Sequence, residues 1–110
     1  MSEAPALAVR PMKDRAGCAL VGELDLAGHR TAWETIAPEL AAGREFTLDV
    51  RELRFMDSSG MHLIVHALAV LGDEGRLVIL DPSPTVRRVL EISGLAGRPN
   101  LEVRGRDGEV

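Results

Sequence analysis

The chain has 110 residues, a hydrophobic content of 45% and a formal net charge of −4, values that indicate one globular domain with enough apolar side chains for a core. This mildly acidic balance argues against direct nucleic-acid binding, which relies on Lys and Arg to neutralise phosphates. The sequence shows neither the pattern of a signal peptide nor the roughly 18 consecutive apolar residues of a membrane-spanning helix. We therefore expect a single cytoplasmic domain of residues 1–110, with its core at about 6–104 and a tail at 105–110, that does not bind membranes.

Two strands are predicted at the start of the chain. An apolar segment at 6–12 ends around Pro11, which removes a donor from the strand ladder and is therefore typical of an edge strand. A polar stretch at 13–17 follows, as expected of a hairpin turn. Residues 19–26 then alternate between apolar and polar side chains, which predicts a strand with one face on the core.

A helix is predicted at about 30–42. Thr31 is the expected N-cap, and Glu34, three residues later, completes the capping-box pattern. Pro38 would remove a helical hydrogen bond inside this range, so we expect a kink just before it or a later start of the helix. Gly43 is the expected C-terminal stop of the helix.

The rest of the chain alternates strands with helices. Strands are predicted at 46–50, 77–80 and 101–103, and helices at about 59–71 and 84–93, each helix being followed directly by glycine. Alternation of this kind requires a mainly parallel or mixed sheet with helices packed on it. The predicted fold class is therefore α/β, with a mixed sheet of about 4–5 strands and three main helices packed on it.

The tetrapeptide Asp57-Ser58-Ser59-Gly60 joins a predicted strand to a predicted helix. Asp and Ser are preferred N-cap residues, so composition by itself indicates a plain helix start. A serine at such a position also displays its hydroxyl beside backbone N–H groups that have no helical acceptor. A hydrolase nucleophile would need the Gly-x-Ser-x-Gly pattern, which is absent here. Because two of the three histidines lie on the same helix as the serine, a catalytic triad is hard to assemble, and we expect no catalytic residue and no enzyme.

His62 and His66 lie four residues apart on the second predicted helix, a spacing that can bind a metal ion. The zincin pattern would require glutamate where this chain has Leu63, and no third ligand is close in the sequence. We therefore expect no metal site and no cofactor, and we interpret both histidines as polar residues on an exposed stripe of the helix.

Three motifs, in the expected order along the chain, resemble those of anti-sigma factor antagonists in the STAS-domain family. The stretch FTLDVRELRFMDSSGMHLIV, at 46–65, resembles the central motif of that family. Gly22-Glu23-Leu24-Asp25 looks like a segment on an early strand of the family, and residues 84–95 are similar to its third-helix motif. The resemblance covers about residues 6–104, nearly the whole chain, and implies a STAS-like sheet with helices on one side.

The resemblance also implies a function. In the family, the unphosphorylated antagonist binds an anti-sigma factor that is itself a serine kinase, and thereby frees the sigma factor. Phosphorylation of a serine at the start of the second helix ends this binding, and a PP2C-type phosphatase restores it. By motif position this serine is Ser58. The residues implied in partner binding are Asp25, Asp57, Ser59, Gly60, Met61 and His62.

The family also contains proteins that work in other ways. STAS domains serve as constitutive scaffolds in stress-signalling assemblies and as accessory subunits of transporters, without use of the serine, and this role is the alternative to a phosphorylation switch. Many relatives have glycine or another small residue where this chain has His62. A bulky ring one turn after Ser58 is expected to alter which partner fits.

Overall fold

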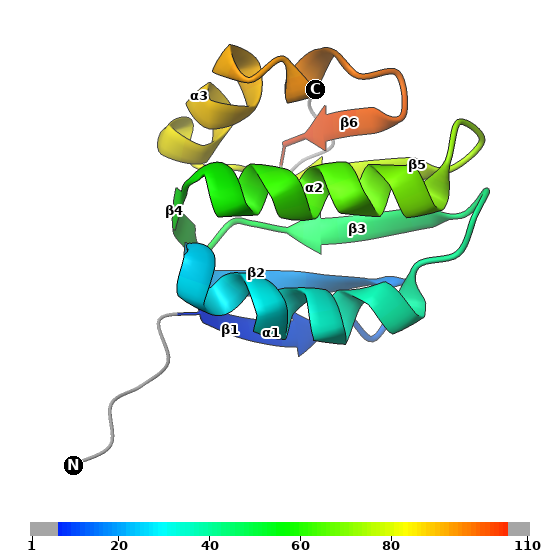
Figure 1. Cartoon of the computed structure of the whole chain (residues 1–110), viewed down its shortest axis with the longest axis horizontal. Helices are drawn as coiled ribbons and strands as arrows, with labels where there is room; N and C mark the ends of the chain where they lie inside the picture. Colours follow the sequence, from blue (N-terminus) through cyan, green and yellow to red (C-terminus); the bar gives the residue numbers. More distant parts are fainter. Residues whose placement is uncertain (1–6, 106–110) are drawn as a thin grey trace.

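The computed structural model describes residues 7–105 as six strands, three α-helices and two short 3-10 helices. The strands form one mixed sheet in the order β1-β2-β3-β5-β6, with β4 beside β2. Helices α1 and α2 lie side by side across one face of this sheet (Figure 1). The predicted tail beyond Gly105 lies outside the described residues, and within them no helix is long and apolar enough to cross a membrane. The bounds are β1 Leu7–Pro11, β2 Gly17–Leu24, α1 Leu26–Ile36, η1 Ala37–Glu39, β3 Glu45–Asp49, β4 Leu53–Met56, α2 Ser58–Leu71, β5 Arg76–Leu80, α3 Pro84–Ile92, η2 Leu95–Gly97 and β6 Leu101–Arg104.

The predicted fold class is confirmed, because the sheet is mixed and carries three main helices. The sheet has an additional strand, because the apolar residues after Asp49 form a strand of their own, β4. The backbone turns between Val50 and Leu53, where the N–H of Leu53 donates to the carbonyl of Val50 at 3.0 Å. Arg54 and Phe55 in β4 are both exposed, so the segment lacks the alternation that marks a half-buried strand.

Strand β2 changes neighbours along its length, and this arrangement positions the start of two helices. Its first residues pair in parallel with β3, whereas its last residues pair in parallel with β4. The register shifts between Gly22 and Glu23, where Gly22 has a φ of 109° that costs glycine little. As a result Leu24 and Met56, the last residues of β2 and β4, lie opposite each other. The helices that follow these strands therefore begin at the same edge of the sheet.

The core lies between the sheet and the helix pair α1 and α2. Alternate residues of the central strands point into it, and the largest of them are at most 2% exposed: Leu20, Phe46, Leu48, Leu77 and Ile79. Helix α2 contributes Leu63, Ile64, Ala67, Leu68 and Leu71 from its buried side. Full burial of one such leucine or isoleucine contributes about 1.5–3 kcal/mol relative to exposure. This layer therefore fixes the position of α2 on the sheet.

The predicted start of the first helix, at about residue 30 with Thr31 as its cap, is wrong. Helix α1 begins directly after Asp25, whose carboxylate accepts hydrogen bonds from the backbone N–H groups of Ala27 and Gly28 at 3.1 and 3.2 Å. Thr31 lies inside the helix, so Thr31 and Glu34 do not form the expected capping box. The alternating strand pattern continues through Asp25, and this continuity hides the cap in the sequence.

The predicted end of the same helix at Gly43 is also wrong. Helix α1 ends at Ile36, and the chain continues as the 3-10 turn η1 with Pro38 in its first positions. The disturbance expected just before Pro38 therefore takes the form of a helix end, because proline cannot supply the N–H that the helix needs. Gly43 lies in the turn before β3, where its φ of +78° is accessible to glycine.

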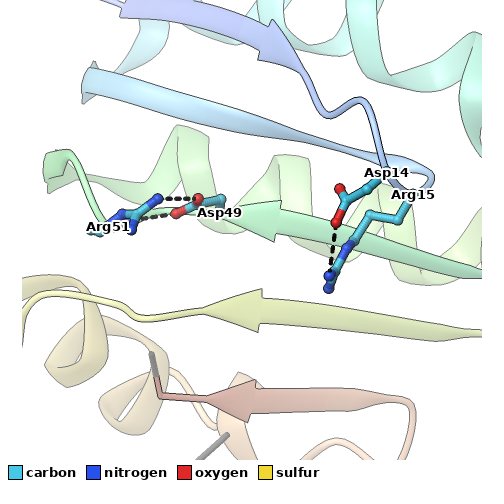
Figure 2. A network of polar contacts seen from close by, with 4 residues as sticks. All are labelled: Asp14, Arg15, Asp49 and Arg51. Atoms are coloured by element: carbon cyan, nitrogen blue, oxygen red, sulfur yellow. Dashed lines mark hydrogen bonds and ion pairs between the residues drawn. The ribbon is translucent and has the colours of Figure 1, made fainter. Parts of the chain in front are cut away.

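The face of the sheet opposite α1 and α2 carries charged side chains. Figure 2 views this face, with the helices behind the strands, and shows Asp49 of β3 paired with Arg51 at 3.0 Å. The same view shows Arg15, in the turn between β1 and β2, paired with Asp14 at 3.1 Å. The exposed Arg15–Asp14 pair contributes about 0–1 kcal/mol. Asp49, in contrast, is only 8% exposed, and its carboxylate accepts hydrogen bonds from both the backbone N–H and the side chain of Arg51.

Candidate functional site

Two helix starts lie side by side at the carboxyl ends of β2 and β4. Each strand leads into its helix through one aspartate: Asp25 caps α1, and Asp57 caps α2. The backbone N–H of Asp57 donates to the carbonyl of Leu24 at 3.3 Å, which joins the two strand ends. The carboxyl edge of parallel strands is where such folds usually bind ligands and partners. Residues far apart in the sequence therefore form one surface here.

Ser58 is the first residue of α2, and it is exposed. The capping bonds of this helix are made by Asp57, whose carboxylate accepts from the N–H of Ser59 at 2.8 Å and whose carbonyl accepts from the N–H of Gly60 at 3.0 Å. Within the described part of the chain, the hydroxyl of Ser58 takes part in no hydrogen bond. It is therefore accessible to a second protein, at the positive end of the helix dipole.

The neighbouring serine is in a different environment. Ser59 is only 9% exposed, and its backbone N–H is held by the Asp57 carboxylate. A kinase has to align an acceptor hydroxyl with the phosphate that it transfers, which requires an accessible side chain. Burial therefore distinguishes Ser58 from Ser59, although both have the same side chain.

Gly60 allows the first turn of α2 to lie close against the ends of β2 and β4. A Cβ atom at this position would lie 2.1 Å from Cγ of Met56 and 3.1 Å from Cδ2 of Leu24. Real Cβ atoms do not approach other heavy atoms to 2.1 Å, so any larger residue would displace the helix start or repack both side chains. Gly60 thus determines how close the start of α2, with the exposed Ser58, lies to the ends of β2 and β4.

An apolar hollow of about 290 Å³ lies beside Ser58, between the start of α2 and the end of α3. Met56, the half-buried Met61 and Val89 contribute to its lining, together with Ile92, which is 73% exposed. Large exposed apolar side chains that cluster in one place mark surfaces used for binding. The site predicted from the sequence does not include α3. The available signal was Ile92, an apolar residue outside the inward-facing stripe of its helix.

The remaining predicted contact residues divide by exposure. Asp25 is half-buried and is followed by Leu26, which is 80% exposed. His62 is exposed on α2, one turn after the serine. Ser59 and Gly60 are buried, so within this site they shape the helix start and offer little surface of their own.

The histidines do not form part of a larger ligand set. Among residues 7–105, no group of three or more His, Cys, Asp or Glu side chains is placed to hold one metal ion. His62 and His66 are both exposed on α2. The surface at this edge of the sheet consists of two acidic caps, one free hydroxyl and several exposed apolar side chains, a combination typical of contacts between proteins.

The sequence matches a known family and a curated relative. The family described as "Mlab, STAS domain" matches residues 9–103. The chain is similar to an anti-sigma F factor antagonist from Lysinibacillus sphaericus, with 37% identity over 79 residues, which is 69% of this chain and 68% of that protein.

Several solved structures are similar to this fold. The anti-sigma factor antagonist SpoIIAA in its unphosphorylated form is 30% identical, with a TM-score of 0.69 over 93% of this chain and 90% of that one. The Bacillus cell fate determinant SpoIIAA in its phosphorylated form is 29% identical, with a TM-score of 0.63 over 93% and 94% of the two chains. An anti-sigma factor antagonist from Mycobacterium paratuberculosis has a TM-score of 0.75 over 91% and 89%, at 18% identity, a likeness of fold alone.

Proposed function

Since this chain belongs to the STAS-domain family of anti-sigma factor antagonists, we propose that it works as a phosphorylation-controlled switch between protein partners. In its unphosphorylated form it binds a cognate anti-sigma factor, itself a serine kinase, and frees the sigma factor. Phosphorylation of Ser58 by that kinase ends the binding, and a PP2C-type phosphatase restores it. The protein acts in the cytoplasm and supplies no catalytic residue of its own.

The observation that carries this proposal is the free, exposed hydroxyl of Ser58 at the start of α2. The buried Ser59 beside it is a much poorer substrate for a kinase. The apolar hollow next to Ser58 offers a surface that a partner buries on binding. Asp25, Asp57, Met61 and His62 lie around the same two helix starts and are the proposed contact residues, together with Ser59 and Gly60, which act through the shape of the turn.

A phosphate at Ser58 is compatible with the fold. It adds about −1.5 to −2 charges at neutral pH, and the start of a helix stabilises an anion by about 0.3–1 kcal/mol. The related SpoIIAA has been solved in an unphosphorylated and a phosphorylated form, and the fold of this chain is similar to both. We therefore expect the phosphorylated protein to remain folded, so that the switch acts at the interface.

The size of the switch depends on where the phosphate lies in the interface. A change from almost complete to almost no binding requires roughly 5.5 kcal/mol of differential affinity. A charge at an exposed rim contributes less than about 1 kcal/mol, whereas a dianion beside the apolar hollow loses its water when the partner docks. Asp25 and Asp57 add like charge at the same edge. Ser58 must therefore lie near the centre of the interface for the switch to work.

Variants at Ser58 test this proposal in a pull-down from the native cell. We expect Ser58→Ala to capture an ATP-binding anti-sigma kinase and Ser58→Asp to lose it. Thr85→Asp is the matched control, because Thr85 is an exposed hydroxyl residue in the first turn of another helix, α3. This control should capture the kinase as well as the wild type does.

Two results would contradict the proposal. Equal capture of a partner by Ser58→Asp and by the wild type would support the constitutive scaffold, or the transporter subunit, that makes no use of the serine. Incubation of the purified pair with ATP, followed by mass spectrometry, identifies the phosphorylated residue. Phosphate on Ser59, with Ser58 unmodified, would refute the assignment of the site.

A further inference from the structure

Three rings meet where α1 and α2 pack together. His29 and Trp33 lie one turn apart on α1, and His66 lies on α2. The ring centroids of His29 and His66 are 6.3 Å apart at an interplanar angle of 66°, and those of Trp33 and His66 are 5.5 Å apart at 66°. The helix pair thus brings together two imidazoles that are far apart in the sequence.

His29 contains an unsatisfied polar atom. Its Nε2 is buried without a hydrogen-bond partner, and within residues 7–105 it is the one side-chain nitrogen or oxygen atom in this condition. Buried polar atoms in native proteins nearly always have a partner, so an atom without one points to a bound water or ion. An imidazole nitrogen that carries no proton offers an electron pair to a metal ion.

We propose that His29 and His66 bind one divalent transition-metal ion, such as zinc or nickel, between α1 and α2. Imidazole nitrogen is a preferred ligand of these ions, and the bond to zinc is about 2.0–2.1 Å long. Each ring centre then lies roughly 3.2 Å from the ion, so at the tetrahedral angle two rings that share an ion have centres roughly 5.2 Å apart. The observed separation is 6.3 Å, so the rings have to approach each other by roughly 1 Å when the ion binds. His66 is exposed, so its ring can turn toward tetrahedral geometry when the ion binds.

This pair differs from the histidine pair that sequence spacing suggests. His62 and His66 come from one helix, whereas His29 and His66 come from two, and it is the latter pair that contains the buried nitrogen without a partner. Water completes the coordination, because no group of three protein ligands occurs among the described residues. The site is therefore weak and exchangeable, and its effect is to tighten the contact between α1 and α2. This proposed site differs from the prediction made from the sequence, which is that the chain has no metal site.

Metal titrations of the tag-free protein test this site. Zn²⁺ at about ten times its Kd should raise the Tm by about 5 °C, because binding to the folded state alone shifts the unfolding equilibrium. Ni²⁺ should quench the emission of Trp33, which is the sole tryptophan of the chain and lies beside His66. We expect His29→Gln and His66→Gln to lose both responses, and His62→Gln, the matched control one turn away on α2, to retain them.

Two outcomes overturn the proposal. Loss of the responses in His62→Gln would assign the ion to the pair on α2 alone. Absence of both responses in the wild type at millimolar metal would mean that water, and no ion, satisfies Nε2 of His29. His66 is exposed, so His66→Gln is expected to fold even if His29→Gln does not. In that case the metal responses of His66→Gln and His62→Gln are compared, and loss in the first with retention in the second supports the proposed pair.

Discussion

Replacement of Gly60 by alanine is expected to destabilise the protein, although such a change usually stabilises a helix. Alanine would contribute up to about 1 kcal/mol of helix propensity. Against this, the new Cβ would lie 2.1 Å from Cγ and 2.8 Å from Sδ of Met56, and 3.1 Å from Cδ2 of Leu24. Both side chains are at most 3% exposed, so they have little room to move. Overpacking of this kind costs about 1–3 kcal/mol, and we expect a net loss of about 1 kcal/mol in the free energy of unfolding.

Urea denaturation followed by circular dichroism measures this loss, which corresponds to a decrease in Tm of about 4–8 °C. Gly97→Ala is the matched control, because a Cβ there meets nothing within 4 Å, and its stability should be unchanged or slightly higher. Met56→Ala should make room for the new Cβ, so the double variant should lose less stability than the two single changes added together. Equal stability of Gly60→Ala and Gly97→Ala would refute the reasoning, and so would additive losses in the double variant.

Two further predictions concern the hollow and the core. Ile92→Glu should keep the wild-type Tm, because Ile92 is 73% exposed, but it should weaken capture of the partner in the pull-down; an unchanged yield would exclude Ile92 from the interface. Burial, with a smaller contribution from Glu39, raises the pKa of the Cys18 thiol from its ordinary 9.0 to about 12. Above the ordinary value the unfolded thiol loses its proton while the folded one keeps it, so the free energy of unfolding should fall as the pH rises from about 9 toward 12. The chain has no tyrosine to titrate in this range, and persistence of the whole pH dependence in Cys18→Ala, measured by urea denaturation, would contradict this explanation.

The helices whose ends carry several agreeing signals are predicted from the sequence to within one residue. Helix α2, expected at 59–71, spans Ser58–Leu71, because an aspartate cap, an apolar run and a final glycine all indicate the same segment. Helix α3, expected at 84–93, spans Pro84–Ile92, with Ser83 as its cap. Local chemistry at both ends is sufficient in these cases, and the tertiary fold adds no competing signal.

Three features could not be predicted from local sequence patterns, because the tertiary fold determines them. They are the start of α1, strand β4 and part of the site. Asp25 satisfies two patterns, the alternation of a strand and the cap of a helix, and the tertiary fold decides between them. Strand β4 is short, and its exposed Arg54 and Phe55 remove the alternating pattern. The motif around Ser58 identifies the cap and the hydroxyl, but the hollow beside it also needs Ile92, which the path of the chain brings from α3.

Strand β4 is held in the sheet by fewer neighbours than the central strands. It pairs with the last residues of β2 and lies outside the continuous path of strands, whereas β3 and β5 each have a strand on both sides. Amide protons exchange with solvent most readily where few interactions have to break for local opening. We therefore expect the amides of β4 to exchange before those of β3 and β5. The segment that leads into Ser58 is then a part of the sheet that opens more readily than the central strands.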